Sequence, residues 1–188
     1  SARDLNEALD IIVSRVQKAM GTEVCSVYLL DPATNRYILM ATEGLYRKAV
    51  GQVSLAYSEG LVGLVGSREE PINLEDAPSH PRYRYFPETG EERFRSFLGV
   101  PIIHHRRVLG VLVVQQRESS RCFDEGEEAF LVTVSAQLAG VIAHSEATGA
   151  ISGLSLTGEE AHDVSFNGVP GAPCLLYTSD AADEEDSV

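Results

Sequence analysis

The chain has 188 residues, 44% of them hydrophobic, which suits one globular domain with some additional length. No stretch approaches the ~20 apolar residues that a membrane-spanning helix requires. The formal net charge of −13 is unevenly placed, because eight acidic residues follow Ala147; the preceding body has 20 acidic and 15 basic residues, a net charge of −5. An acidic body argues against nonspecific nucleic-acid binding, which requires a basic surface.

The first predicted element is an amphipathic helix over residues 4–20, ended by Gly21. Two strands over residues 22–31 and 36–44 follow as a hairpin, because the turn sequence PATN separates two runs rich in β-branched and aromatic residues. Residues 52–58 are expected to form a third strand. The apolar stripe of the helix comprises Leu5, Leu9, Ile12, Val16 and Ala19.

A short glycine-rich helix is predicted next, capped by Ser58 and ended before Pro71. Its glycines recur every three residues and are expected to line one side, allowing close packing on a sheet. Residues 71–76 are predicted to be a short extended piece, and residues 77–93, with their prolines and aromatic residues, a loop.

A second hairpin is predicted over residues 93–118. Its two apolar runs, 97–103 and 108–114, leave neither strand a solvent-facing side, so we expect both faces of this hairpin to be covered. His104 and His105 lie in its basic tip. Neighbouring strand residues point to opposite faces, so these histidines are not expected to share a metal ion.

The last predicted element is a helix over residues 124–146. Asp124 and Glu127 form an acidic capping box at its start. Strands grouped between two terminal helices predict an α+β fold with an antiparallel sheet. The loop over residues 77–93 is expected to fold over the sheet and enclose a small-molecule pocket. The apolar stripe of the last helix is Leu131, Val134, Leu138 and Val141.

Three regions are predicted. Residues 1–147 form the folded domain, and residues 148–173 are a linker with the start of a further region. Residues 174–188 contain CLLYTSDAADE, the translation of a widely used sequencing adapter, so they are expected to be a disordered artefact without function.

Five separated motifs occur in an order that resembles a GAF domain, from about Leu5 to Ser145. They are EVCSVYLLD, EGLVGLVG, EPINLEDAPSHPRY, EERFRSFLGVPI and LGVLVVQQRE. Within that family they are most similar to the N-terminal GAF domain of the nitrogen-related phosphotransferase-system Enzyme I, a phosphoenolpyruvate–protein phosphotransferase.

The resemblance implies a sheet of about six antiparallel strands, with helices on one face and a loop-covered ligand pocket on the other. It also implies a cytoplasmic regulatory domain that senses glutamine or 2-oxoglutarate. The parent enzyme would pass phosphate to a phosphocarrier protein, and Mg²⁺ would belong only to its missing catalytic region. No catalytic residue, metal ion or cofactor is expected in the present chain, and neither a membrane nor a nucleic acid is expected as a partner.

The loop and its flanks hold the candidate ligand-binding residues. Carboxylate and amide groups there could bind an amino group, and Arg82, Arg84 or Arg93 could pair with a carboxylate. The alternative is that these residues are turn formers and surface charges. The candidates are Leu61, Asn73, Asp76, Tyr83, Arg93 and Phe97.

Two other functions remain open. The domain could be a structural homodimerisation module without a ligand, with a dimer lost when Leu131 and Leu138 become charged. It could also be a cysteine-dependent redox enzyme, like the free methionine sulfoxide reductases that share the GAF fold. That reading would need Cys25 and Cys122 within disulfide reach over the pocket.

Overall fold

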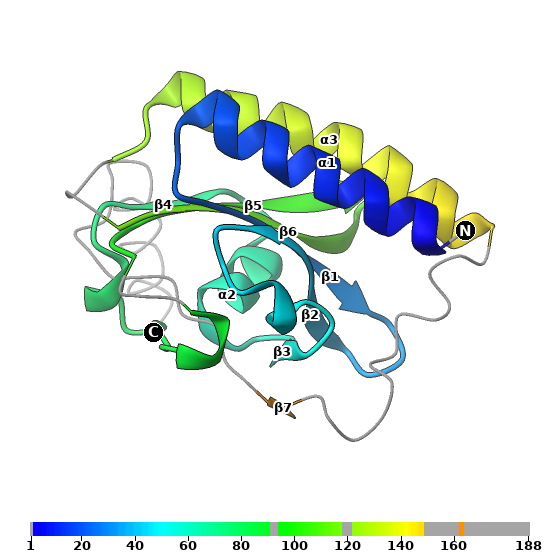
Figure 1. The fold of residues 1–188 in the computed structure, drawn as a ribbon, viewed down its shortest axis with the longest axis horizontal. Coiled ribbons are helices and arrows are strands. Elements are labelled where there is room, and N and C mark those ends of the chain that lie inside the picture. The colour runs from blue at the N-terminus through cyan, green and yellow to red at the C-terminus, as the bar shows by residue number, and fades with distance from the viewer. Residues whose placement is uncertain (1, 91–93, 118–121, 149–161, 164–188) are drawn as a thin grey trace.

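A computed structural model describes residues 2–90, 94–117, 122–148 and 162–163 (Figure 1). The predicted artefact segment, 174–188, and most of the predicted linker, 148–173, lie outside these residues. In chain order the elements are α1 Ala2–Met20, β1 Val24–Asp31, β2 Arg36–Glu43, β3 Val53–Ala56, α2 Gly60–Arg68, β4 Ile72–Leu74, β5 Ser96–His104, β6 Arg107–Gln116, α3 Glu125–Ala147 and β7 His162–Asp163.

The strands form a single sheet in the order β4-β5-β6-β1-β2-β3-β7. The pairings among β1–β6 are all antiparallel, and only the two-residue β7 pairs in parallel, with β3. The predicted α+β class and six-stranded antiparallel sheet are therefore confirmed.

The predicted hairpin of two apolar strands is β5 and β6, which lie inside the sheet and are covered on both faces. Successive strand residues alternate in direction, so Phe97 and Val113 join the core beneath α2. Leu98 and Val114 join the other core, beneath α1 and α3. The two strands lack alternating polar residues because each face of the hairpin packs into a separate core.

Helices α1 and α3 lie antiparallel, side by side, on one face of the sheet (Figure 1). The predicted capping box starts α3: the Glu127 amide donates to Asp124 Oδ1 at 2.8 Å, and the Asp124 amide donates to Glu127 Oε1 at 3.1 Å. These two bonds satisfy amide groups that the first turn of a helix leaves without backbone partners.

The predicted apolar stripe of α3 has two different environments. Leu131 and Leu138 are fully buried against the sheet, whereas Val141 is 39% exposed. Charging either leucine would therefore disrupt the core and could not serve as a specific test of a dimer. By length and composition alone α3 is also apolar enough to cross a membrane. In this fold 28% of its most apolar 18-residue stretch is buried.

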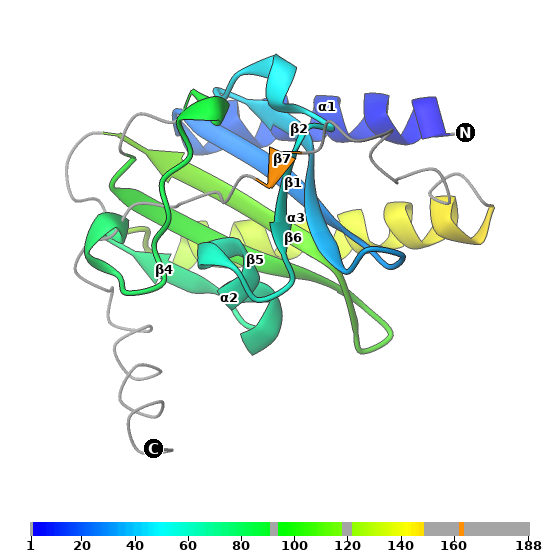
Figure 2. The same cartoon turned by 90° about the horizontal axis from the view of Figure 1, so that it is seen from below.

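The opposite face of the sheet carries α2 and the flap, which we define as residues 75–90 (Figure 2). The N-cap of α2 is Glu59, in place of the predicted Ser58, and no side chain caps the helix. A Cβ atom at Gly66 would lie 1.8 Å from the Tyr37 hydroxyl oxygen, so this glycine allows α2 to press closely onto β2.

Candidate functional site

A hollow of about 410 Å³ opens at the flap, a size typical of small-molecule sites. Its described lining includes Pro78, Tyr83, Tyr85 and Arg95. Two tyrosine rings and a proline provide apolar walls, and the guanidinium group of Arg95 adds a single positive charge. This composition suits a small ligand that has both an apolar stem and an anionic end.

Backbone hydrogen bonds place Arg95 between the flap and the sheet. The Ala77 amide donates to the Arg95 carbonyl at 2.7 Å, and the Arg95 amide donates to the Gln116 carbonyl at 2.9 Å. The first bond holds the short 3-10 helix Ala77–Ser79 of the flap, and the second holds the end of β6. The hollow therefore lies against the start of β5 and the end of β6.

An acidic group accompanies this arginine. The Arg95 Nη1 atom lies 3.5 Å from Asp76 Oδ1, with the two side chains 54% and 30% exposed. An ion pair this open to solvent stabilises a protein by at most about 1 kcal/mol. Both groups can thus exchange this contact for contacts with a bound ligand at little cost.

The far end of the flap is anchored by burial and by backbone contacts. Phe86 and Phe94 are 8% and 1% exposed, and the Thr89 hydroxyl donates to the Phe86 carbonyl at 2.8 Å. The Tyr46 amide donates to the Thr89 carbonyl at 2.8 Å, which ties this end to the loop after β2. The stretch between these anchors carries the two tyrosines of the hollow.

The predicted ligand residues take different places in the structure. Tyr83 lines the hollow, and Asp76 contacts Arg95 at its side. Leu61 and Phe97 are fully buried in the core beneath α2. Arg93 lies outside the described residues.

Asn73 is directed away from the flap. Its neighbours Ile72 and Leu74 join the core beneath α2, so the alternation of β4 turns Asn73 toward the helices. Its side-chain amide donates to the Phe123 carbonyl at 2.8 Å, just before α3. Asn73 therefore connects β4 to the start of α3 and lies apart from Tyr83 and Asp76.

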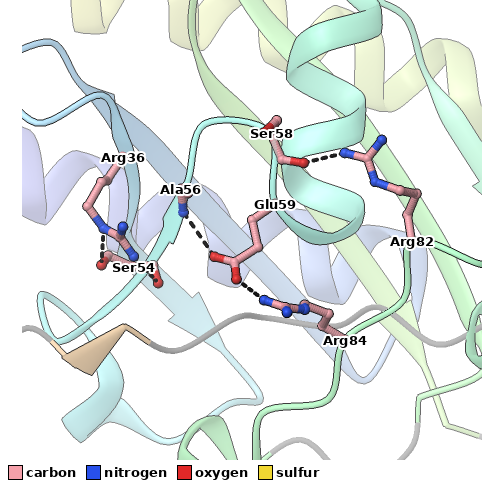
Figure 3. A network of polar contacts seen from close by, with 7 residues as sticks. All are labelled: Arg36, Ser54, Ala56, Ser58, Glu59, Arg82 and Arg84. Carbon is pink, nitrogen blue, oxygen red and sulfur yellow. Dashed lines mark hydrogen bonds and ion pairs between the residues drawn. The ribbon is translucent and has the colours of Figure 1, made fainter.

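The arginines expected to bind a ligand carboxylate contact the protein instead. Arg84 forms an ion pair with Glu59, and Arg82 donates to the Ser58 carbonyl (Figure 3). The arginine at the hollow is Arg95, which the sequence analysis did not single out. Residues 82–85 alternate arginine and tyrosine in the sequence. In extended backbone such neighbours point to opposite sides, so this pattern could have indicated that the arginines and the tyrosines would face different surroundings.

The histidines of the β5–β6 tip do not point to opposite faces. Their rings stack with centroids 3.9 Å apart, because His105 has left the strand for a left-handed conformation with φ 49°. No group of three metal-binding side chains occurs among residues 2–90, 94–117, 122–148 and 162–163.

The position of Cys25 does not favour the alternative of a cysteine-dependent redox enzyme. This thiol is fully buried in the core beneath α1 and α3, on the face of the sheet away from the hollow. Burial raises the pKa of Cys25, and Glu43 raises it further, so the reactive thiolate is disfavoured. Cys122 lies just before α3 and is exposed.

Comparison with known proteins relates the chain to one domain family. The family model of the GAF domain matches residues 4–142. The phosphoenolpyruvate-dependent phosphotransferase system proteins of Salmonella typhimurium and Escherichia coli are each 57% identical over 148 residues, which cover 79% of this chain and 20% of the relative. The chain thus spans about a fifth of their length.

Two solved structures are also similar. The GAF domain of a phosphoenolpyruvate–protein phosphotransferase from Coxiella burnetii is 51% identical with a TM-score of 0.75, covering 78% of this chain and 86% of that one. The corresponding GAF domain from Acinetobacter is 52% identical with a TM-score of 0.70, covering 77% and 85%.

Proposed function

Because the chain belongs to the GAF domain family, we propose that it is the regulatory, small-molecule-sensing domain of a phosphoenolpyruvate–protein phosphotransferase, with glutamine as its ligand. The observation that carries the proposal is the pairing of Arg95 and Asp76 beside the hollow walled by Tyr83 and Tyr85. The parent enzyme would act in the cytoplasm with a phosphocarrier protein as its partner.

The charges of the site favour glutamine over 2-oxoglutarate. A zwitterionic amino acid presents one carboxylate, which suits the Arg95 guanidinium group, and one ammonium group, which suits the Asp76 carboxylate. The dianion 2-oxoglutarate would present two carboxylates where the described lining offers one arginine, and it would place negative charge near Asp76. Its binding would bring one of these carboxylates close to the like charge of Asp76.

The first prediction is a glutamine-dependent rise in thermal stability. At 100 times its Kd, glutamine should add about 2.7 kcal/mol to the free energy of unfolding, which raises Tm by roughly 5–10 °C. Differential scanning calorimetry with L-glutamine and, separately, 2-oxoglutarate measures this shift. A rise with 2-oxoglutarate and none with glutamine would contradict the charge argument.

Variants locate the binding site. Arg95→Gln removes a charge-assisted contact of about 1.5–3 kcal/mol and should raise the Kd for glutamine by at least tenfold. Asp76→Asn should also raise the Kd for glutamine, because it removes the negative charge that would contact the ligand ammonium group. The control is Arg106→Gln, which removes an exposed arginine from the β5–β6 tip. Equal glutamine affinity in Arg95→Gln and the parent chain would show that glutamine does not bind in this hollow.

A second candidate function, homodimerisation, is favoured by the exposed side of α3. From Ala129 to Ala143 the helix carries no charged residue, although Phe130 and Val132 are each 40% exposed. A hollow of about 270 Å³ lies beside Phe130 in the groove between α1 and α3, where Val134 of α3 and Ile12 of α1 also line it. Exposed apolar helix surfaces of this kind mark protein interaction sites, and a second copy of the chain would present the same apolar surface.

The dimer prediction concerns Phe130, because it lines this groove. Phe130→Glu should convert a dimer to a monomer, since two carboxylates would meet in an apolar interface. Sedimentation velocity measures the change. The control Gln52→Glu adds the same charge at an exposed position before β3. A Phe130→Glu chain that stays dimeric would place the interface elsewhere.

A further inference from the structure

The flap segment Arg82–Tyr85 has two differently engaged sides. Tyr83 and Tyr85 line the hollow, whereas Arg82 and Arg84 extend to the turn between β3 and α2 (Figure 3). Side chains alternate in this way along extended backbone. The two tyrosines would thus contact a ligand through their rings, while the two arginines attach the same segment to the protein through their guanidinium groups.

Glu59 is the centre of this attachment. One of its carboxylate oxygens accepts a hydrogen bond from the Ala56 amide at 3.0 Å, and the other forms an ion pair with Arg84. The Glu59 side chain is only 17% exposed, whereas that of Arg84 is 56% exposed. The carboxylate therefore belongs to the packed body of the domain and the guanidinium group to the flap.

The turn that receives both arginines is packed tightly against α2. A Cβ atom at Gly63 would lie 2.6 Å from the carbonyl carbon of Ser58, so turn and helix touch without an intervening side chain. Glu59 is also the N-cap of α2, whose first seven residues are buried. A displacement of this turn is therefore transmitted to α2, because close-packed elements cannot absorb it locally.

We propose that Glu59 is a positioning residue that holds Tyr83 and Tyr85 at the hollow through Arg84. Through the same contact it couples ligand binding at the hollow to the packing of α2 against the sheet. The identity of the ligand rests on the proposed function, but the clamp, which we define as Glu59, Arg84, Arg82 and Ser58, does not. By linkage the coupling is reciprocal: a ligand that orders the rings strengthens the clamp, and a firm clamp increases ligand affinity.

Trypsin tests the clamp without any ligand, because it cleaves after arginine only when the side chain is free to enter its specificity pocket. In Glu59→Gln the amide oxygen still accepts the Ala56 bond, while the charge that holds Arg84 is lost. Initial cleavage after Arg82 and Arg84, quantified by mass spectrometry, should become about fivefold faster, the scale expected for losing one partly exposed ion pair. Cleavage at the parent rate would overturn the clamp.

Two further variants separate the clamp from other effects. Glu88→Gln removes the same charge from an exposed position in the flap and should leave cleavage unchanged. Arg84→Gln breaks the ion pair from the solvent side and should accelerate cleavage after Arg82 as Glu59→Gln does. Acceleration in Glu59→Gln alone would indicate damage to α2 and would overturn the proposal.

The positioning role requires a second readout, the Kd for glutamine. Glu59→Gln should raise this Kd by up to about fivefold, because the apparent Kd varies inversely with the population of the binding-competent arrangement of the rings. Faster cleavage with a Kd equal to that of the parent chain would overturn the positioning role. Faster cleavage in a chain whose parent binds no glutamine would support the clamp and reject the proposed ligand.

Discussion

Leu138→Asp is expected to unfold the domain. Leu138 is fully buried between α3 and the sheet, within the core that also contains Leu98 and Val114. A carboxylate at this position would have no solvent, and its burial, charged or neutral, should cost at least about 4 kcal/mol. Small domains have only about 5–15 kcal/mol of stability in total, so the loss removes most of it.

Far-UV circular dichroism and urea denaturation measure this effect. The matched control is Val141→Asp, three residues further along the same helix, where the side chain is 39% exposed. It should keep the native spectrum and change the midpoint little when measured at concentrations that favour a monomer. A native, cooperatively unfolding Leu138→Asp chain would contradict the assignment of this side of α3 to the core.

Gly66→Ala is the substitution expected to have the second-largest effect. The added methyl group would meet the Tyr37 hydroxyl oxygen at 1.8 Å and its Cζ atom at 2.8 Å. Tyr37 is fully buried and stacks on Tyr57, with ring centroids 6.2 Å apart, so it has little room to withdraw. Overpacking of this kind should cost about 2–3 kcal/mol of unfolding free energy.

The same geometry predicts how a second change rescues the first. Within the described part of the chain the Tyr37 hydroxyl has no hydrogen-bond partner, so Tyr37→Phe alone should be nearly neutral. The double variant Gly66→Ala/Tyr37→Phe should recover about half of the lost unfolding free energy. The Tyr37 hydroxyl oxygen, the atom nearest the added methyl group, is then gone, but the ring edge remains. Chemical denaturation of all three variants gives the coupling energy.

A helix glycine with open space provides the control. Nothing lies within 4 Å of a Cβ atom at Gly140, so Gly140→Ala should be neutral or stabilise the chain by up to about 1 kcal/mol. Equal costs for Gly66→Ala and Gly140→Ala would show that α2 is not seated on Tyr37 as described.

The clamp and the hollow assign the flap a role in the proposed sensing function. Its two ends are held by the Ala77 and Tyr46 backbone bonds, and its middle is held by arginines that reach α2. A ligand at Tyr83 and Tyr85 would therefore act on a segment that is already coupled to the core. Ligand binding and the packing of α2 against the sheet can then be measured separately in one chain.

Local sequence patterns were sufficient to predict the elements of this fold. The capping box of Asp124 and Glu127 could be predicted because its partners are three residues apart, within one helical turn. The apolar runs of β5 and β6 predicted a hairpin covered on both faces, because strand side chains alternate and neither run has a polar position for solvent. These inferences concern neighbours along the chain, whose geometry the backbone itself determines.

The direction of single side chains at the site was decided only by tertiary structure. The sequence identified Asn73, Arg82 and Arg84 as polar residues near a loop. Their partners, however, are the Phe123 carbonyl 50 residues away, the Ser58 carbonyl 24 residues away and Glu59 25 residues away. Such contacts depend on how whole elements pack, and no local period encodes them. For the same reason, only the assembled fold brought Arg95 and Asp76 to the hollow.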